Sequence, residues 1–214
     1  PVLFDERISS GLIGHLLSAV NGGSVARGNS WAKGLMGEQV LPKGFGLVEE
    51  PHRARVGGSK PFDGEGLPTA TNPLVEDGML LRWILDLANA RKLGLQSTAN
   101  AARGTGGPPS PSAGNLRLTG PQTTREALLK DMGEGLLVTS MMGSSINPNT
   151  GDYSRGASGF WVRGGEIAEP VNECTIAGSL PEMLKGMRAA DDARQHLSRV
   201  IPSLLVEGLT VAGA

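Results

Sequence analysis

Two short polar segments carry the side chains of this sequence that are best suited to chemistry. The first, Pro61-Phe-Asp-Gly-Glu-Gly66, places Asp63 and Glu65 two residues apart between glycines. Two carboxylates at this spacing are able to act as an acid/base pair or to hold a cation. The same pattern is typical of a tight turn whose aspartate accepts hydrogen bonds from backbone amides. We predict the structural turn and keep the acid/base pair as the alternative.

The second segment, Asn147-Pro-Asn-Thr-Gly-Asp-Tyr-Ser-Arg-Gly156, joins two apolar stretches. Polar loops held on a rigid sheet are common places for recognition residues. The two segments together supply the candidates for contacts with a peptide or a partner protein. These candidates are Asp63, Glu65, Asn147, Thr150, Asp152, Ser154 and Arg155.

The residues that could bind zinc or act as nucleophiles lack a recognised spacing. The three histidines, His15, His52 and His196, have no second histidine or glutamate at the spacing of a metalloprotease helix. Ser158 lies between glycines but outside a Gly-x-Ser-x-Gly elbow. Cys174 stands in an apolar strand pattern, which predicts a buried thiol. We therefore expect no catalytic residue, no metal and no cofactor on this chain.

The composition limits the class of protein. The 214 residues include 32 glycines, 20 basic and 21 acidic side chains, and one cysteine. This share of glycine is about twice the usual one and indicates many tight turns. The net charge of −1 leaves no basic stripe for nucleic acid, and no apolar stretch approaches the length of a membrane span. A single cysteine fits a reducing compartment, so we expect a cytoplasmic protein that binds neither nucleic acid nor membrane.

Apolar spacing predicts the helices of the N-terminal part. Apolar residues recur at helical spacing from Ile8 to Val20. Asp5 or Ser9 could cap this helix, and Asn21-Gly22-Gly23 would end it. A second short helix is expected from Trp31 to Val40.

Two hairpins are predicted further along, turned at Asp77-Gly78 and at Gly164-Gly165. Thr123 or Thr124 is expected to cap a helix that runs through Met132, and the spacing Thr123-x-x-Glu126 fits a capping box. Ser179 is expected to cap a helix that reaches about Ala190.

The stretch from Ser97 to Asn115 is rich in Gly, Pro, Ser, Ala and Thr and has almost nothing to bury. It predicts a flexible loop rather than a domain boundary. Hairpins with segregated helices indicate one α+β domain over residues 1–214. We expect a mainly antiparallel, barrel-like sheet with a few flanking helices.

Seven motifs in a specific order make the sequence similar to the C-terminal half of the TldD/PmbA family, also called the modulator-of-DNA-gyrase family. They are Gly11-Leu-Ile-Gly-His15, Ser59-Lys-Pro-Phe-Asp-Gly-Glu-Gly66, Ala90-Arg-Lys-Leu-Gly94, Asn147-Pro-Asn-Thr-Gly-Asp-Tyr-Ser-Arg-Gly156, Ser158-Gly-Phe-Trp161, Thr175-Ile-Ala-Gly178 and Leu209-Thr-Val-Ala-Gly213. The resemblance runs from about Val2 to the C-terminus, and the longest motifs resemble the PmbA (TldE) branch. The N-terminal domain of the family is accordingly expected to be absent from this sequence.

The resemblance implies a cytoplasmic zinc peptidase, built as a TldD–TldE heterodimer, that acts on unfolded or extended peptides. In that family the TldD-type subunit supplies a His-Glu-x-x-x-His helix from its first half and a cysteine ligand near its end. This sequence has neither, because Cys174 precedes Ile176-Ala-Gly178 and Arg188-Ala-Ala-Asp-Asp-Ala-Arg-Gln-His196 stands where the ligand loop would be expected. The departures agree with the PmbA branch, which resembles this sequence in lacking the ligands.

Three functions follow as hypotheses. The leading one is a non-catalytic C-terminal domain of a PmbA/TldE-like subunit, which pairs with a zinc-bearing TldD-type subunit or with a second copy and guides extended peptides. Such peptides can add as a strand to a sheet edge. The second is an autonomous hydrolase with a dispersed site built from Asp63, Glu65 and His52. The third is a regulator that binds gyrase or another protein.

Overall fold

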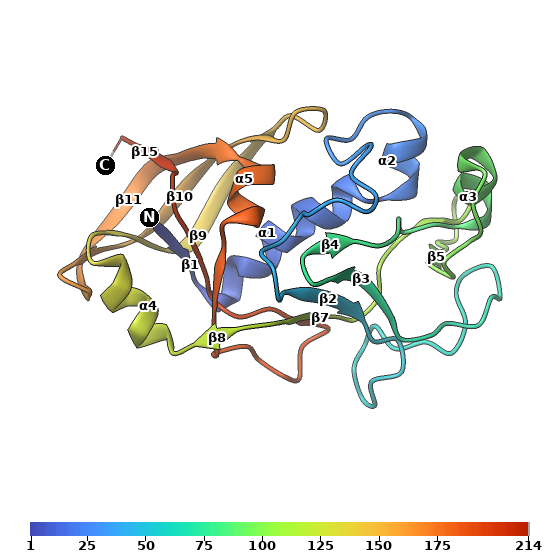
Figure 1. The fold of residues 1–214 in the computed structure, drawn as a ribbon, viewed down its shortest axis with the longest axis horizontal. Helices are drawn as coiled ribbons and strands as arrows, with labels where there is room; N and C mark the ends of the chain where they lie inside the picture. The colour runs from blue at the N-terminus through green and yellow to red at the C-terminus, as the bar shows by residue number, and fades with distance from the viewer. Residues whose placement is uncertain (214) are drawn as a thin grey trace. The chain divides into compact units, whose positions relative to one another are not determined.

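The structure is a computed structural model that describes residues 1–213, with the backbone alone for Ser144. The chain divides into two compact units, which we name after their main sheets (Figure 1). The eight-strand unit comprises Pro1–Ile13, Gly120–Gln195 and Ile201–Ala214. The five-strand unit comprises Gly14–Thr119 and His196–Val200.

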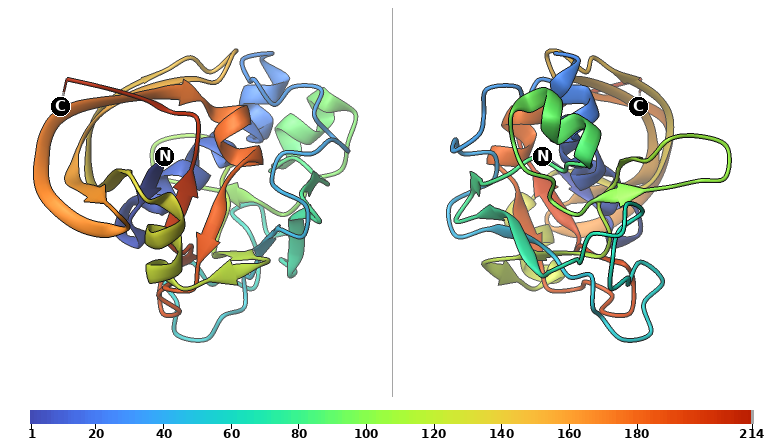
Figure 2. Two further views of the ribbon diagram at one scale, coloured as in Figure 1. Left: turned by 60° about the vertical axis from the view of Figure 1, so that its left-hand side comes forward. Right: turned by 90° about the vertical axis from the view of Figure 1, so that its right-hand side faces the viewer.

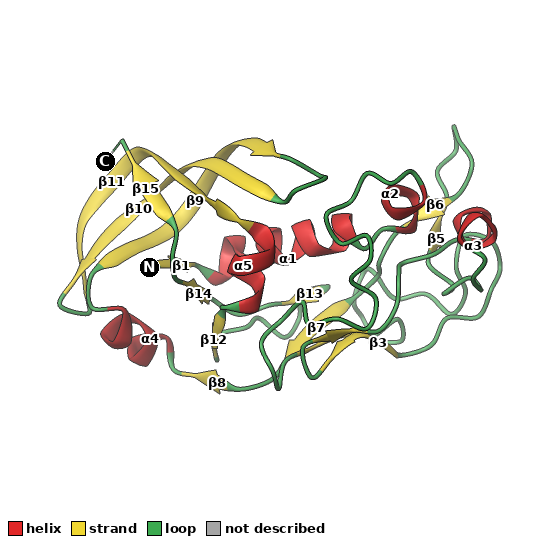
Figure 3. Cartoon of the chain, turned by 45° about the horizontal axis from the view of Figure 1, so that its top comes forward, coloured by secondary structure: helices red, strands yellow, loops and turns green. Residues whose placement is uncertain are grey.

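The sheet of the eight-strand unit has the order β15-β11-β10-β9-β1-β14-β12-β8. Its strands are β1 (Val2–Phe4), β8 (Gln122–Thr123), β9 (Gly135–Ile146), β10 (Asp152–Arg163), β11 (Glu166–Ser179), β12 (Arg188–Ala190), β14 (Leu204–Val206) and β15 (Thr210–Ala212). Pairing is antiparallel except between β1 and β9 and between β12 and β8. The long strands β9, β10 and β11 form a meander (Figure 3). The sheet is open, with β15 and β8 at its edges, so the predicted barrel-like closure is not found among the described strands.

Two helices belong wholly to the eight-strand unit, α4 (Arg125–Met132) and α5 (Leu180–Lys185). Helix α4 lies beside the turn between β10 and β11 (Figure 2). Its apolar face packs on the sheet in one core cluster that joins five strands to the helix. The members of this cluster are Leu3, Leu128, Leu129, Met132, Leu137, Val162, Ala190 and Leu205.

The five-strand unit contains the sheet β13-β7-β2-β3-β4 and a separate pair, β5 with β6. Its strands are β2 (Gly46–Glu49), β3 (Asn72–Glu76), β4 (Met79–Leu80), β5 (Ala101–Ala102), β6 (Ser110–Pro111), β7 (Leu116–Thr119) and β13 (Arg199–Val200). Helices α2 (Gly22–Ala26) and α3 (Leu87–Leu93) belong to it, and α1 (Glu6–Ala19) begins in the eight-strand unit and ends here. Much of this unit is loop (Figure 3). The mainly antiparallel α+β class is confirmed.

Several predicted boundaries are confirmed because local chemistry sets them. The backbone N–H of Arg7 donates to Asp5 Oδ1 at 3.2 Å, so Asp5 caps α1 as predicted. Asp77 and Gly78 have φ of 47° and 79°, the two left-handed residues that a type I′ turn requires. The second hairpin turns at Gly164-Gly165 as expected.

Three predicted helical features are wrong. Residues 31–40 form turns instead of a helix, because Gly34 and Gly37 adopt φ of 92° and 79°. Thr124, one of the two predicted caps, caps α4 by accepting from Ala127 N–H at 3.1 Å, so only the Thr123–Glu126 capping box does not form. Helix α5 ends at Lys185, because Arg188–Ala190 pairs as strand β12.

The segment from Ser97 to Asn115 is anchored at both ends. Asn100 and Asn115 are 1% and 0% exposed, and Ala101 is fully buried. The expectation that this segment buries almost nothing is therefore wrong at its ends. Residues 102–108 between them are exposed, and the mobility of this stretch stays a prediction.

Candidate functional site

Asp63 forms the centre of a turn in the five-strand unit. Its carboxylate is 3% exposed and accepts three backbone hydrogen bonds. Oδ1 accepts from the N–H groups of Glu65 and Leu67, each at 2.9 Å, and Oδ2 accepts from Ala101 N–H at 3.1 Å. Both carboxylate oxygens are thus committed to the backbone. The structural turn predicted from the sequence is confirmed.

Glu65 is committed to the start of helix α3. Its Oε2 accepts from Leu87 N–H at 2.9 Å, and Asp86 Oδ1 accepts from Asn89 N–H at 2.7 Å in the same first turn. Carboxylates at a helix N-terminus satisfy free N–H groups and oppose the helix dipole. Glu65 is half-buried and fixes where α3 begins relative to the Asp63 turn.

The structure does not assemble His52 with these carboxylates. Nε2 of His52 lies 3.1 Å from Thr69 Oγ1, and the Thr69 hydroxyl also donates to Lys60 O. No described hydrogen bond or ion pair joins His52 to Asp63 or Glu65. The acid/base alternative therefore has no geometric support.

A buried polar cluster around Glu49 was missed from the sequence. Glu49 is 6% exposed, and its two carboxylate oxygens each accept from Asn100 Nδ2 at 2.8 Å. Oε1 also accepts from Gly114 N–H at 2.6 Å, and Oε2 accepts from Arg82 Nη2 at 3.2 Å. The cluster ties strand β2 to both ends of the segment 97–115. The available signal was a glutamate at the end of an otherwise apolar strand pattern, Phe45-Gly-Leu-Val-Glu49.

The second polar segment lies in the eight-strand unit, where residues 147–151 form the turn between β9 and β10 and residues 152–156 begin β10. Asn147 Oδ1 accepts from Asn149 N–H at 3.0 Å, and the Thr150 hydroxyl donates to Asp152 Oδ2 at 2.6 Å. Asn147, Thr150 and Asp152 are exposed. The two predicted segments therefore belong to different units.

Strand β10 holds Ser154 and Arg155, the other two candidates of this segment. Ser154 pairs with Ser145 on β9 and with Ala177 on β11. Arg155 Nε donates to Gly143 O at 2.8 Å across the β9–β10 hairpin. Both side chains are half-buried. Their contacts are those of a stable hairpin end.

Two buried side chains of the nucleophile type belong to this sheet, Cys174 on β11 and Tyr153 on β10. Cys174 is 1% exposed and its thiol donates to Ala157 O at 3.2 Å. Burial raises the pKa of the Cys174 thiol, which keeps it protonated. Burial also raises the pKa of Tyr153 to about 12, against the opposing charge of Arg155. Neither group is prepared to act as a nucleophile at neutral pH.

The residues present do not fit a zinc site. Across the described residues 1–213, no group of three or more His, Cys, Asp or Glu side chains is arranged to hold a metal ion. Catalytic zinc requires three such protein ligands around one point. Asp63 and Cys174 are occupied by backbone partners.

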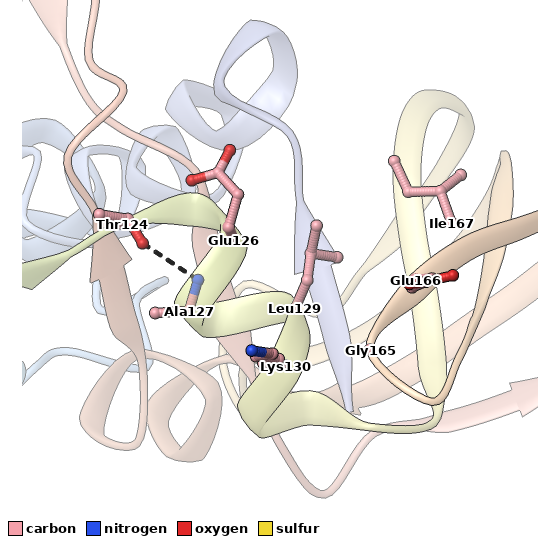
Figure 4. Close-up of a pocket in the computed structure, with 8 residues that line it drawn as sticks. All are labelled: Thr124, Glu126, Ala127, Leu129, Lys130, Gly165, Glu166 and Ile167. Carbon is pink, nitrogen blue, oxygen red and sulfur yellow. Dashed lines mark hydrogen bonds between the residues drawn. The ribbon is translucent and has the colours of Figure 1, made fainter.

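An apolar groove lies between helix α4 and the β10–β11 turn (Figure 4). It encloses about 610 Å³, and Leu129 and Ile167 contribute apolar surface to it. Gly165 brings the turn close to the helix, because a Cβ there would lie 2.9 Å from Lys130 Cα. Ile167 is 51% exposed. The groove borders the first residues of β11.

The edge of β11 is largely open at this groove. β15 pairs with Thr175, Ile176 and Ala177, whereas residues 166–174 have β10 as their partner among the described strands. An open strand edge presents backbone N–H and C=O groups that another extended segment can pair with.

Comparison with known proteins identifies the family. The profile of the PmbA/TldA metallopeptidase C-terminal domain matches residues 1–213. The chain belongs to this family. Among the relatives that cover the whole chain are Metalloprotease PmbA of Escherichia coli O157:H7, 41% identical, and the Metalloprotease PmbA homolog of Haemophilus influenzae, 43% identical. A Metalloprotease TldD homolog of Buchnera aphidicola is 25% identical over 99% of the chain. The chain spans 46% of the length of each of these proteins, about half.

Solved structures of family members share the fold. A proposed modulator of DNA gyrase from Bacteroides thetaiotaomicron superposes on the entire chain with a TM-score of 0.88 at 28% identity, over 46% of its own length. A similarly named protein from Thermotoga maritima gives 0.85 at 32% identity over 99% of the chain and 49% of its own length. TldE from Thermococcus kodakarensis gives 0.85 at 23% identity over 99% of the chain and 50% of its own, which shows the fold alone. Within residues 1–213, no helix has the length and apolar character needed to cross a membrane.

Proposed function

We propose that this chain is the C-terminal domain of a PmbA/TldE-type subunit that does not hydrolyse peptides itself. It pairs with a TldD-type subunit that carries zinc, and it helps to hold unfolded peptides for that partner. The observation that carries the proposal is the family match over residues 1–213. The higher identity to the PmbA relatives than to the TldD homolog, 41% and 43% against 25%, supports the PmbA/TldE assignment.

The side chains support a non-catalytic role. The carboxylates that looked suited to chemistry, Asp63 and Glu65, accept backbone hydrogen bonds that fix a turn and a helix start. Because the described residues hold no group of metal ligands, zinc is assigned to the partner. The assembly is cytoplasmic in this proposal, in keeping with the buried free thiol of Cys174.

Peptide holding is assigned to the open edge of β11 and the groove beside it. Main-chain hydrogen bonds to an edge strand accept many sequences, which suits a subunit that handles unfolded chains. The groove adds an apolar contact through Leu129 and Ile167 (Figure 4). The candidates on the β9–β10 turn, Asn147, Thr150 and Asp152, are exposed and available to the partner subunit.

The test is to produce a TldD-type subunit alone and together with this chain, and to measure co-purification, zinc content and hydrolysis of an unfolded protein. We expect a stable complex that contains zinc and hydrolyses the substrate. Hydrolysis by the isolated chain, with stoichiometric zinc, would instead establish the autonomous hydrolase. A TldD-type subunit that does not bind this chain and is fully active alone would refute the proposed pairing.

The groove is tested in the same complex with one variant and a matched control. Ile167→Glu places a charge in the groove at an exposed position, so we expect a raised KM with unchanged assembly. Met36→Glu makes the same change at another exposed apolar side chain, 38% accessible against 51% for Ile167, and should leave KM unchanged. Equal KM values for both variants and the parent would remove the groove from peptide holding.

A further inference from the structure

A small polar pocket in the five-strand unit lies beside a largely buried arginine. The pocket has a volume of about 300 Å³ and is lined by Pro68, Ala70, Asn72, Arg82 and the segment Ser97-Thr98-Ala99. The Arg82 side chain is 17% exposed. Of the described residues that line the pocket, Arg82 alone carries a charge. An anion entering the pocket would therefore meet a guanidinium and no carboxylate among the lining residues, while Glu49 bonds to the same guanidinium from outside the lining.

Two of the three guanidinium nitrogens of Arg82 are fixed by hydrogen bonds. Nε donates to Pro73 O at 3.1 Å, and Nη2 donates to Glu49 Oε2 at 3.2 Å and to Asn72 O at 3.3 Å. Nη1 has no hydrogen-bond partner among the described residues. Nη1 is therefore the guanidinium nitrogen that can donate to a ligand in the pocket. Because the guanidinium is planar and its Nε and Nη2 are hydrogen-bonded, the two N–H groups of Nη1 have a fixed direction.

Glu49 does not exhaust the capacity of Arg82 for an anion. The Glu49 carboxylate accepts from Asn100 Nδ2 and from Gly114 N–H as well as from Arg82, so several donors share its charge. Burial lowers the pKa of Arg82 and Glu49 opposes this shift, but arginine stays charged at neutral pH. A partly buried charge with an unpaired nitrogen gains from a second anionic acceptor.

The walls of the pocket are rigid. The Thr98 hydroxyl donates to Asn100 Oδ1 at 2.7 Å, and Ser97 Oγ accepts from Ala99 N–H at 3.2 Å. Ala99 adopts a left-handed φ of 55°, an unusual conformation for a residue with a side chain. The segment is therefore held in one conformation beside Arg82 by its own bonds, which prepares the pocket before any ligand arrives.

We propose that this pocket binds the carboxylate of an extended peptide, with Arg82 Nη1 as the donor. A single free nitrogen suits a singly charged carboxylate better than a phosphate group, which needs several donors. The volume accommodates the carboxylate together with the small part of a residue that bears it. The carboxylate is either the C-terminus of the peptide or an Asp or Glu side chain.

Three N-acetylated pentapeptides of one Ala/Gly/Ser sequence distinguish these sources. One has a free C-terminal carboxylate, one a C-terminal amide, and one an amide with a central Glu. Binding is followed by NMR of the ¹⁵N-labelled chain, at the amides of Thr98 and Ala99 and at the Arg82 side chain. We expect at least about tenfold tighter binding of one or both carboxylate peptides than of the plain amide. Equal binding of all three, or no saturable shifts up to about 10 mM, would overturn the proposal.

Three variants separate the pocket from general charge effects. Arg82→Lys keeps the charge but removes Nη1, and Ala70→Leu fills the pocket at an exposed position without touching the Arg82–Glu49 pair. Each should weaken the carboxylate peptide about tenfold. The control, Arg91→Gln, removes an exposed positive charge from helix α3 and should leave binding unchanged. Equal losses in Arg82→Lys and Arg91→Gln, or no loss in Arg82→Lys and Ala70→Leu, would contradict the assignment.

Only the peptide nature of the ligand rests on the proposed function. The pocket assignment and the proposed function can therefore be refuted by different results. If the complex with a TldD-type subunit hydrolyses peptides while the three probes bind equally, the pocket assignment is wrong and the function stands. If the carboxylate probes bind through Arg82 while no complex forms, the pocket is a carboxylate site of a protein with another role.

Discussion

Several buried or half-buried carboxylates in this protein hold the backbone in place. Asp63, Glu65 and Asp86 accept from N–H groups of turns and of helix α3, and Glu49 accepts from Asn100 and Gly114. Backbone N–H groups in loops have no helix or sheet partner, so a carboxylate that collects two or three of them stabilises an irregular chain segment. This explains how a unit that is largely loop remains ordered around a small sheet.

Asp63→Asn tests this role directly. The amide keeps one oxygen for Glu65 and Leu67 N–H, but its Nδ2 would face Ala101 N–H, a donor against a donor. We expect the free energy of unfolding to fall by about 1 to 3 kcal/mol, measured by urea denaturation. Glu76→Gln, the same change at an exposed position in β3, is the control and should alter it little. Normal stability together with a hundredfold loss of turnover in the assembled complex would make Asp63 catalytic instead.

A second carboxylate gives a dependence on pH. Burial acts to raise the pKa of Asp5, but the hydrogen bonds from Arg7 and the charges of Arg125 and Arg7 outweigh it and leave the pKa below its ordinary value of 3.8. A carboxyl with a lowered pKa stabilises the fold above that ordinary value and loses its contribution as the pH falls through the lowered one. We therefore expect Asp5→Asn to be less stable than the parent at pH 7, with the difference shrinking in acid below about pH 3.8. A difference that stays constant from pH 7 to pH 2 in urea titrations would show that the Asp5 charge contributes nothing.

Helix α4 and the β10–β11 hairpin depend on one close contact. Gly165 has φ of 81° and no room for a Cβ against Lys130, whereas Gly164 has φ of 58° and open space around it. Gly164→Ala should cost about 1 to 2 kcal/mol through backbone strain alone. Gly165→Ala should cost about 1 to 3 kcal/mol more, because the hairpin must also move away from the helix. Thermal unfolding measures both, and equal losses would mean that the contact with α4 adds nothing.

The segment 97–115 combines fixed ends with an exposed centre. Ala101 N–H donates to Asp63 and Gly114 N–H donates to Glu49, while residues 102–108 are exposed. We expect the amides of residues 103–107 to exchange with solvent much faster than those of Ala101 and Gly114 in hydrogen-exchange measurements. Protection of 103–107 equal to that of buried Leu136 and Leu137 would contradict a mobile centre.

Features that depend on neighbouring residues were predictable from the sequence, and features that depend on distant residues were not. The Asp77-Gly78 and Gly164-Gly165 turns were predictable because their conformation depends on adjacent residues. The end of α5 was not, because Arg188–Ala190 becomes a strand by pairing with β8 and β14, which lie far away in the sequence. Arg82 was missed for the same reason, since its partner Glu49 lies 33 positions earlier. The Asp63 turn was predicted. Its third hydrogen bond, from Ala101 N–H, could not be predicted because Ala101 lies 38 positions further along the chain.

The two polar segments that the sequence offered as contact candidates belong to different units. Asp63 and Glu65 belong to the five-strand unit, and Asn147 to Arg155 belong to the eight-strand unit. The open β11 edge and the Arg82 pocket are likewise in different units. Each therefore requires its own variant, because a loss of function in one unit says nothing about the other.

The assignment of zinc to the partner makes a prediction about the whole assembly. If this chain contributes no ligand, the variants His52→Ala, His196→Ala and Cys174→Ser should leave the zinc content of the complex with a TldD-type subunit unchanged. His52 bonds to Thr69 and Cys174 to Ala157, so the variants at these two positions lose only a structural contact. Zinc per complex is measured by elemental analysis after gel filtration, so that an unassembled fraction does not count. Replacing a histidine of the partner's His-Glu-x-x-x-His helix is the positive control and should remove the metal, because a three-ligand site does not survive the loss of one ligand. A loss of zinc in any of the three variants of this chain, with assembly intact, would show that this chain supplies a zinc ligand. The non-catalytic role would then be wrong.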